Sequence, residues 1–223
     1  MIPVTIKQAP SVTIARFLCL PHSRFLTVQP TCGREPGSGS KLQLARAPEL
    51  RMLSHMRSPD KQVPRLMSDR LVLRPFEITD APSLARITNN PLLLRNLLRT
   101  SCPFTVHDAR NRILRFRKNN LRVWAIDNGQ LLGLIGLAGE FGLWLGRGAW
   151  GKGYGEEASR LVIDHAFTHM KMTVLHANPI SDNRASCHLM EKLGFSVVGR
   201  TQSFCKQRNK RVALRRYELK NGG

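Results

Sequence analysis

The sequence predicts a mixed α/β fold, in which helices cover the faces of a β-sheet. Strand-like and helix-like segments alternate over residues 71–219 in the order strand, two helices, three strands, helix, strand, helix and two strands. Asp127-Asn128-Gly129 between two apolar runs predicts a β-hairpin. A glycine-dense turn over residues 146–155 joins a strand to a helix. Together these features favour a sheet that is partly antiparallel and packed against helices.

The first half of this pattern begins with a short strand at Leu71–Phe76. Asp80, with Pro82 close behind, predicts a helix start, and Asn90-Pro91 predicts its end. Thr105 and Asp108 have the spacing of a capping box and open a second helix. Strands are then expected at 121–126, 131–137 and 141–145.

The second half begins with a helix at 156–170 and a strand at 173–177. Asp182 or Asn183 is expected to cap a further helix that runs to Leu193, with Gly194 as its stop. Strands at 195–198 and 211–219 complete the chain.

The 223 residues are enough for one domain and an extension. Eight prolines and the linker-like Gly33–Ser40 lie within residues 1–66. We therefore expect a domain at 67–223, preceded by a disordered or non-native basic extension at 1–66. Met67 would be the natural start in the second case, and an Arg-rich, acid-poor transit peptide is the less favoured alternative.

Composition argues against several classes of protein. The five cysteines lack C-x-x-C spacing, which argues against a zinc site and favours reduced thiols in a cytoplasmic protein. No apolar run approaches the roughly 18 residues of a membrane span, so we expect no membrane association. The net charge of +20 fits either a well-solvated surface or a polyanionic neighbour such as a ribosome, a nucleic acid or an acidic cofactor.

The glycine turn predicts a phosphate-bearing cofactor, because it places unpaired N–H groups at a helix N-terminus. Gly146–Gly151 reads G-x-G-x-x-G, but no acidic residue follows the next strand as a dinucleotide fold requires. Gly146–Gly153 nearly matches a P-loop, but Gly153 replaces the Ser or Thr that holds magnesium. Neither of these two motifs explains the turn.

A third pattern does. Trp150–Ala158 reads Trp-Gly-Lys-Gly-Tyr-Gly-Glu-Glu-Ala, and this stretch resembles the cofactor loop of the Gcn5-related N-acetyltransferase (GNAT) superfamily. It is most similar to the branch of ribosomal-protein N-acetyltransferases. The resemblance covers roughly residues 67–220 in the correct order, with further motifs at 69–76, 132–136, 140–144, 183–186 and 191–195.

The resemblance implies acetyl-CoA as donor and a primary amine as acceptor, and with the cysteine spacing we expect no metal. It also implies a mostly antiparallel central sheet whose strands 141–145 and 173–177 splay apart. The residues that it assigns to acetyl-CoA are Leu143, Trp144 and Leu145 through their main chain, the diphosphate loop Gly151, Lys152, Gly153, Tyr154, Gly155 and Glu156, and Asn183. An N-cap is the simpler role for Asn183.

Two residues are candidates for catalysis. Glu140 matches the position of the general base in histone-modifying members, although it could be an exposed carboxylate beside a hairpin turn. Many members of the superfamily carry a Tyr that acts as the general acid, and Met190 stands at that position here. Ser186 is therefore the candidate that protonates the leaving thiolate.

The acceptor remains open between a protein N-terminus and a small-molecule amine. The branch favours a ribosomal protein, with possible ribosome association, and either a monomer or a homodimer would fit. The alternative is a non-catalytic RNA- or ribosome-associated module on the same fold, based on the basic segments Arg110–Arg122 and Lys206–Arg216.

Overall fold

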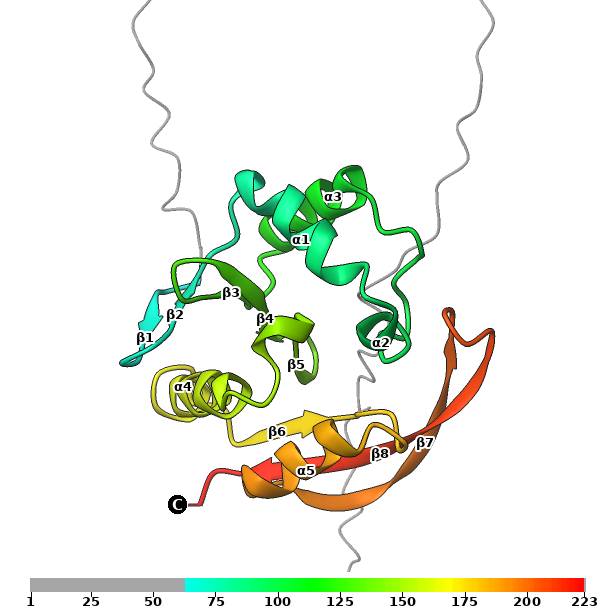
Figure 1. Cartoon of the computed structure of the whole chain (residues 1–223). Helices are drawn as coiled ribbons and strands as arrows, with labels where there is room; N and C mark the ends of the chain where they lie inside the picture. Colours follow the sequence, from blue (N-terminus) through cyan, green and yellow to red (C-terminus); the bar gives the residue numbers. More distant parts are fainter. Residues whose placement is uncertain (1–62, 223) are drawn as a thin grey trace, which may run out of the picture. The chain divides into compact units, whose positions relative to one another are not determined.

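The computed structural model describes residues 63–222, which form two antiparallel sheets and the helices that cover them (Figure 1). The five-stranded sheet has the order β1-β2-β3-β4-β5, and the three-stranded sheet has the order β6-β8-β7. Of the extension expected at 1–66, residues 1–62 lie outside the described residues, whereas residues 63–66 are described and contact the domain. Val63 and Leu66 pack against the core, and the Trp124 indole N–H donates to the Pro64 carbonyl at 2.8 Å.

The strands are β1 (Leu66–Met67), β2 (Val72–Arg74), β3 (Val123–Asp127), β4 (Leu131–Leu137), β5 (Phe141–Leu145), β6 (Val174–Ala177), β7 (Ser196–Cys205) and β8 (Lys210–Lys220). The helices are η1 (Ile78–Asp80), α1 (Ala81–Thr88), α2 (Pro91–Leu94), α3 (Val106–Lys118), η2 (Arg147–Ala149), α4 (Tyr154–Thr168) and α5 (Arg184–Lys192).

The predicted mixed fold and the order of its elements are confirmed. The capping box of Thr105 and Asp108 forms at the start of α3, and Gly129 takes a φ of +96° in the β3–β4 hairpin. The predicted end of the first helix before Asn90-Pro91 is confirmed, and Asn90 also caps an additional short helix, α2. Two local predictions were wrong: the final hairpin extends well past residue 198 along β7, and α4 begins at Tyr154 rather than at 156.

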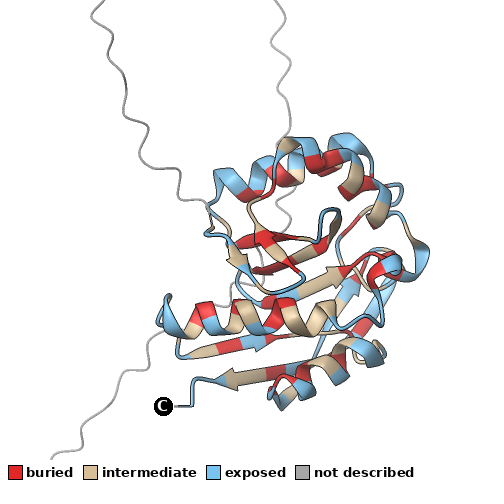
Figure 2. Ribbon diagram, turned by 60° about the vertical axis from the view of Figure 1, so that its left-hand side comes forward, coloured by how far each residue is buried: buried red, intermediate tan, exposed pale blue. Residues whose placement is uncertain are grey.

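Strand β3 explains how the layers are built. Its side chains alternate, so that Val123 and Ala125 face one core while Trp124 and Ile126 face another. α1 and α3 cover the first face with Leu84 and other apolar groups, and α4 covers the second. Figure 2 shows the buried positions on the inner sides of these helices. A strand with two buried faces fixes the sheet between two helical layers.

Arg74 on β2 ties the start of α1 to the five-stranded sheet. Its guanidinium bonds both Asp80 and Asp127 at 2.8 Å, and the Asp80 carboxylate also accepts from Glu77 N–H. Burial by itself would raise the pKa of Asp80, but these hydrogen bonds outweigh it and the pKa is lowered. Asp80 therefore precedes α1 as predicted, but its side chain bonds Arg74 and the η1 turn and does not cap α1.

We expect Asp80→Asn to lower the free energy of unfolding at pH 7 by roughly 1.5–3 kcal/mol, because a charge-assisted pair is lost. The lowered folded-state pKa stabilises the fold above the unfolded value of about 3.9, and this contribution is lost as pH falls through the folded pKa. Denaturant titration between pH 7 and pH 2 measures both effects. Asp164→Asn, at an exposed position on α4, is the matched control, and equal losses in the two variants would contradict the role of Asp80.

Candidate functional site

The N-terminus of α4 has backbone N–H groups that no helical residue satisfies. Gly153 is the N-cap with a φ of +80°, and no side chain caps the helix there. Gly151 also has a left-handed φ of +72°, a conformation that residues with a Cβ rarely adopt. The N–H groups of both Glu156 and Glu157 bond the Gly153 carbonyl, so the amides before them are left for another acceptor. A bound anion would satisfy them.

The two glutamates of the first turn do not compete with such an anion. Glu156 pairs with Arg160 and Lys192, and hydrogen bonds from Lys192 and then Arg160 lower its pKa. Burial would raise the pKa of Glu157, but hydrogen bonds from Ser68 and Arg70 lower it overall. Both carboxylates are thus bound and neutralised by neighbouring side chains. Glu156 can therefore take part in the predicted cofactor site through its backbone and not through its side chain.

β5 is an edge strand, because it pairs with β4 and with no other strand of residues 63–222. β6 lies in the other sheet, so the two strands are not joined by a backbone ladder, as expected for splayed strands. A Cβ at Gly155 would touch Leu143, Leu145 and Leu189 at 3.5–3.6 Å. The structure thus brings together β5, the first turn of α4 and α5. Trp144 points to the opposite core.

Asn183 and Ser186 form the start of α5. The Asn183 side-chain oxygen Oδ1 accepts from Ser186 N–H at 3.3 Å, and its side-chain nitrogen Nδ2 donates to Ser186 Oγ at 2.9 Å. Asn183 is therefore the N-cap, and Asp182 is not: its carboxylate pairs with Arg208. Because Ser186 Oγ acts as acceptor in this bond, its hydrogen can be donated elsewhere. Both side chains are half-buried.

Glu140 lies at the opposite end of β5 from the glycine loop, about 16 Å away for five extended residues. The Asn178 amide, just after β6, donates to Glu140 Oε1 at 2.7 Å. This bond ties the two sheets together where their backbones do not pair. The second carboxylate oxygen remains at an exposed position.

Sequence reasoning missed the contacts of three residues, two at the glycine loop and one at Glu140. Trp150 donates its indole N–H to the Leu145 carbonyl at 2.7 Å and so fixes the end of β5. Arg70 bonds the Lys152 carbonyl and lies over the Tyr154 ring at 5.0 Å. Asn178 holds Glu140. The Trp150 motif was visible in the sequence, but nothing in the sequence marks Arg70 or Asn178 as neighbours of residues more than 35 positions away.

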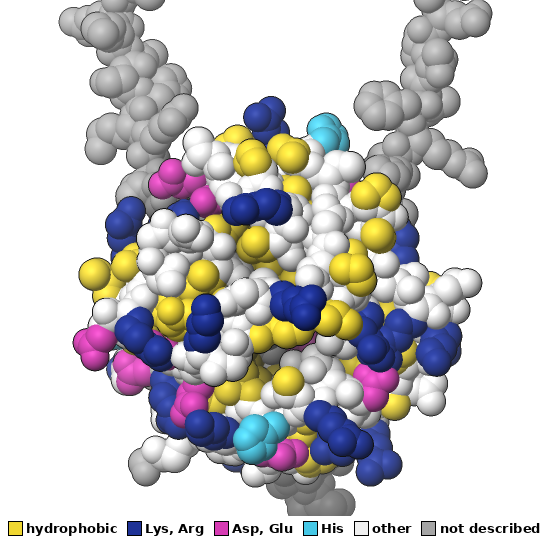
Figure 3. Space-filling model, in the orientation of Figure 1, with side chains coloured by type: hydrophobic (Ala, Val, Ile, Leu, Met, Phe, Trp, Pro, Cys, Tyr) yellow, Lys and Arg dark blue, Asp and Glu magenta, His cyan; other side chains and the backbone are white. Residues whose placement is uncertain are grey.

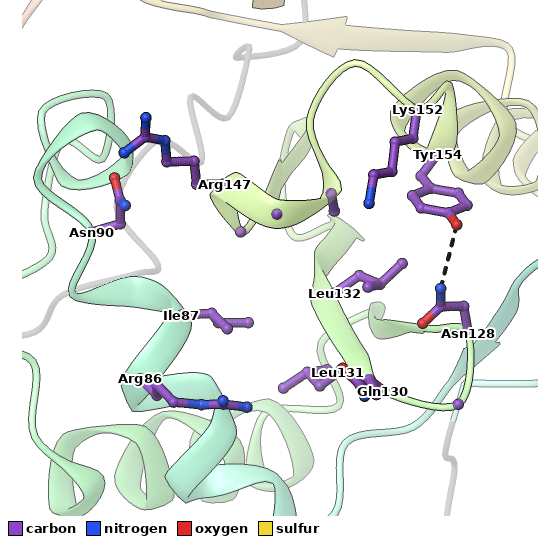
Figure 4. Close-up of a pocket in the computed structure, with 14 residues that line it drawn as sticks. Arg86, Ile87, Asn90, Asn128, Gln130, Leu131, Leu132, Arg147, Lys152 and Tyr154 are labelled. Atoms are coloured by element: carbon purple, nitrogen blue, oxygen red, sulfur yellow. Dashed lines mark hydrogen bonds between the residues drawn. The ribbon is translucent and has the colours of Figure 1, made fainter.

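A cavity of about 690 Å³ lies beside the loop (Figure 4). It is lined by the end of α1, the β3–β4 hairpin and the η2 segment, and we call it the hairpin cavity; its residues are Arg86, Ile87, Asn90, Asn128 to Leu132, Gly146 to Ala149, Lys152 and Tyr154. Of the predicted site residues, Lys152 and Tyr154 line it, and the Tyr154 hydroxyl accepts a long 3.4 Å bond from Asn128. Asn183 and Ser186 do not line this cavity.

Within residues 63–222 no helix is long and apolar enough to cross a bilayer. The same part of the chain brings together no three His, Cys, Asp or Glu side chains that could hold a metal ion.

Comparison with known proteins agrees with this geometry. The family model described as the acetyltransferase (GNAT) domain matches residues 70–196. A protein of Bacillus licheniformis called uncharacterized N-acetyltransferase p20 is 27% identical over 170 residues, which are 69% of this chain and 94% of that protein.

Two solved structures share the fold. The ribosomal-protein-S5-alanine acetyltransferase of Vibrio fischeri has a TM-score of 0.63 at 18% identity, covering 71% of this chain and 97% of its own. The microcin C7 self-immunity acetyltransferase MccE, solved with acetyl-CoA and AMP, has a TM-score of 0.62 at 16% identity, covering 69% and 94%. The chain belongs to the GNAT acetyltransferase family.

We expect Gly153→Ala to weaken acetyl-CoA binding about tenfold, because a Cβ in the left-handed region costs roughly 1–2 kcal/mol and shifts the loop amides. Isothermal titration calorimetry measures the affinity. Gly199→Ala is the matched control, because Gly199 has no left-handed φ and open space around it. Unchanged affinity in Gly153→Ala would show that this loop does not hold the ligand.

Proposed function

We propose that this protein is an acetyl-CoA-dependent N-acetyltransferase that acts on a primary amine by direct transfer. The observation that carries the proposal is the uncapped N-terminus of α4 beside an unpaired edge of β5. The loop amides would bind the diphosphate of acetyl-CoA, helped by the helix dipole. The β5 edge would bind the pantetheine arm as an additional strand does. A cytoplasmic location and the absence of a metal requirement are part of the same proposal.

The residues present fit such a ligand. Gly151 and Gly153 keep side chains away from the loop backbone, and neither has a heavy atom closer than 3.4 Å to the place of a Cβ. Asn183 and Ser186 lie at the start of α5, and α5 reaches the first turn of α4 through Leu189. The acetyl-CoA complex of MccE, which has a similar fold, supports the choice of donor.

In the proposed reaction the neutral amine attacks the thioester carbonyl carbon, the new C–N bond forms and the C–S bond breaks. The amine loses one proton and the leaving thiolate gains one. Ser186 would donate its hydroxyl hydrogen to the thiolate and recover a proton from solvent. Glu140 would accept the amine proton, directly or through water, on the carboxylate oxygen that Asn178 leaves unoccupied. Positioning of the two reactants supplies the larger part of the acceleration.

For the acceptor we propose a protein N-terminus, and in particular that of a ribosomal protein. The loop motif at 150–158 and the fold shared with a ribosomal-protein acetyltransferase support this choice. A basic surface, visible as Lys and Arg side chains spread over the face in Figure 3, would favour an acceptor on an anionic particle.

The decisive experiment is release of free thiol from acetyl-CoA in the presence of a panel of amines. The panel contains peptides that begin with Ser or Ala, the same peptides with blocked N-termini, a polyamine and an aminoglycoside. We expect release to be accelerated by the peptides with free N-termini. The enzyme proposal fails if no amine accelerates release; the acceptor proposal alone fails if a small-molecule amine is the better substrate.

We expect Ser186→Ala to lower kcat about 10²-fold or more while the affinity for acetyl-CoA stays within a few-fold, because only the leaving thiolate would lose its donor. Ser186→Thr keeps a hydroxyl and should retain most of the rate. Steady-state kinetics and calorimetry separate the two effects. Equal rates for the Ala and Thr variants would leave Ser186 with a structural role only.

Glu140→Gln keeps an acceptor for Asn178 but cannot accept a proton. We expect this variant to lose about 10²-fold in kcat and to lose the basic group from the pH–rate profile. Glu140→Ala, which also removes the tie to Asn178, is the companion variant. A normal rate in the Gln variant with a low rate in the Ala variant would mean that Glu140 only holds the two sheets together.

The non-catalytic RNA-binding alternative has one observation in its favour. Phe204 on β7 is 53% exposed and pairs across the hairpin with Arg211, so an aromatic ring lies beside a cation on a solvent-facing ribbon. Steeply salt-dependent RNA binding without any thiol release would support this alternative and exclude the enzyme proposal.

A further inference from the structure

The hairpin cavity has a strongly one-sided charge. Arg86 from α1, Arg147 from η2 and Lys152 from the glycine loop line it, and among residues 63–222 no Asp or Glu does. Figure 4 shows these three side chains on different sides of the opening. Three cations around one space repel one another, and an anion bound between them offsets this repulsion. The cavity is therefore electrostatically suited to a ligand with more than one negative charge.

None of these three cations pairs with a carboxylate of the described residues. Elsewhere the fold pairs its arginines closely, as with Arg74, Arg70 and Arg208. For Arg86, Arg147 and Lys152 the structure shows no ion pair to a carboxylate within residues 63–222. All three are exposed and can reach a ligand without breaking an existing interaction.

The rest of the lining suggests what the anion is attached to. Ile87, Leu131 and Leu132 supply half-buried apolar surface between the cations. Asn90, Asn128 and Gln130 add amide groups at the sides. The volume of about 690 Å³ is within the range of small-molecule sites. A ligand with an apolar or aromatic group and a doubly charged anionic group would match both the apolar surface and the three cations.

We propose that the hairpin cavity is a phosphate-monoester site, in which Arg86 and Arg147 bind the phosphate and Lys152 assists. Arginine forms paired, charge-assisted hydrogen bonds to phosphate oxygens. Two arginines match the two negative charges of a phosphate monoester better than they match the single charge of a carboxylate. The phosphate has two possible sources: the 3′-phosphate of coenzyme A, which rests on the function proposed above, or a separate phosphorylated ligand. Lys152 belongs to both the cavity and the loop, which places the two sites side by side.

The test uses the full chain and the double variant Arg86→Gln/Arg147→Gln, which leaves Lys152 in the loop unchanged. Arg200→Gln, an exposed arginine on β7, is the matched control. Calorimetry compares acetyl-CoA with acetyl-dephospho-CoA, which lacks the 3′-phosphate. A second titration uses phenyl phosphate, an aromatic monoester, with and without saturating acetyl-CoA. Thermal unfolding confirms that the variants fold, as expected for exposed positions.

If the 3′-phosphate of coenzyme A occupies the cavity, the wild type prefers acetyl-CoA over acetyl-dephospho-CoA by about tenfold to a hundredfold, and the double variant loses that preference. Phenyl phosphate then competes with acetyl-CoA. If a separate ligand occupies it, phenyl phosphate binds even at saturating acetyl-CoA, and the double variant loses that binding. Both results support the site and distinguish its source.

The site is overturned if the double variant leaves both the acetyl-CoA preference and phenyl phosphate binding as in the wild type and in Arg200→Gln. Failure of the wild type to bind acetyl-CoA at all would defeat the proposed function instead. The phenyl phosphate titration would still test whether the hairpin cavity binds a phosphate monoester in that case.

Discussion

The break in backbone pairing between β5 and β6 is the constraint on which the candidate site depends. Two neighbouring strands would ordinarily complete one sheet, and every N–H and C=O of β5 would then be used. Here β5 ends the five-stranded sheet and β6 begins the three-stranded one. A side-chain bond from Asn178, just after β6, to Glu140, just before β5, links the two sheets. The remaining edge of β5 is left for a ligand that can pair as a strand does.

Ion pairs and hydrogen bonds from neighbouring residues determine the charge around the glycine loop. α4 begins with two acidic residues, which would normally repel a phosphate at the same helix end. Lys192 and Arg160 neutralise Glu156, while Ser68 and Arg70 hold Glu157. The same contacts anchor α4 to α5 and to the β1–β2 region. Structural ion pairs therefore both hold the helix in place and leave its N-terminus favourable to anions.

Much of the candidate site could be predicted because its signals are local in the sequence. Asn183 acts within a single turn, so spacing alone predicts its side-chain cap, and the density of glycines over residues 146–155 predicts the loop before α4. The partner of Glu140 could not be predicted, since Asn178 is 38 residues away and the two meet only when the sheets assemble. The hairpin cavity was missed for the same reason, because Arg86 and Arg147 come from separate elements.

The sequence by itself determined the order of helices and strands, the hairpin at Gly129 and the glycine loop before α4, because periodicity, caps and turns depend on neighbouring residues. The local motifs also indicate the GNAT acetyltransferase family, which the family model matches. Tertiary structure alone decided that Asp80 bonds Arg74 and that Trp150 closes the end of β5. It also decided that three cations surround one cavity. These features depend on which distant side chains packing brings within a few ångströms, and local sequence signals do not encode that information.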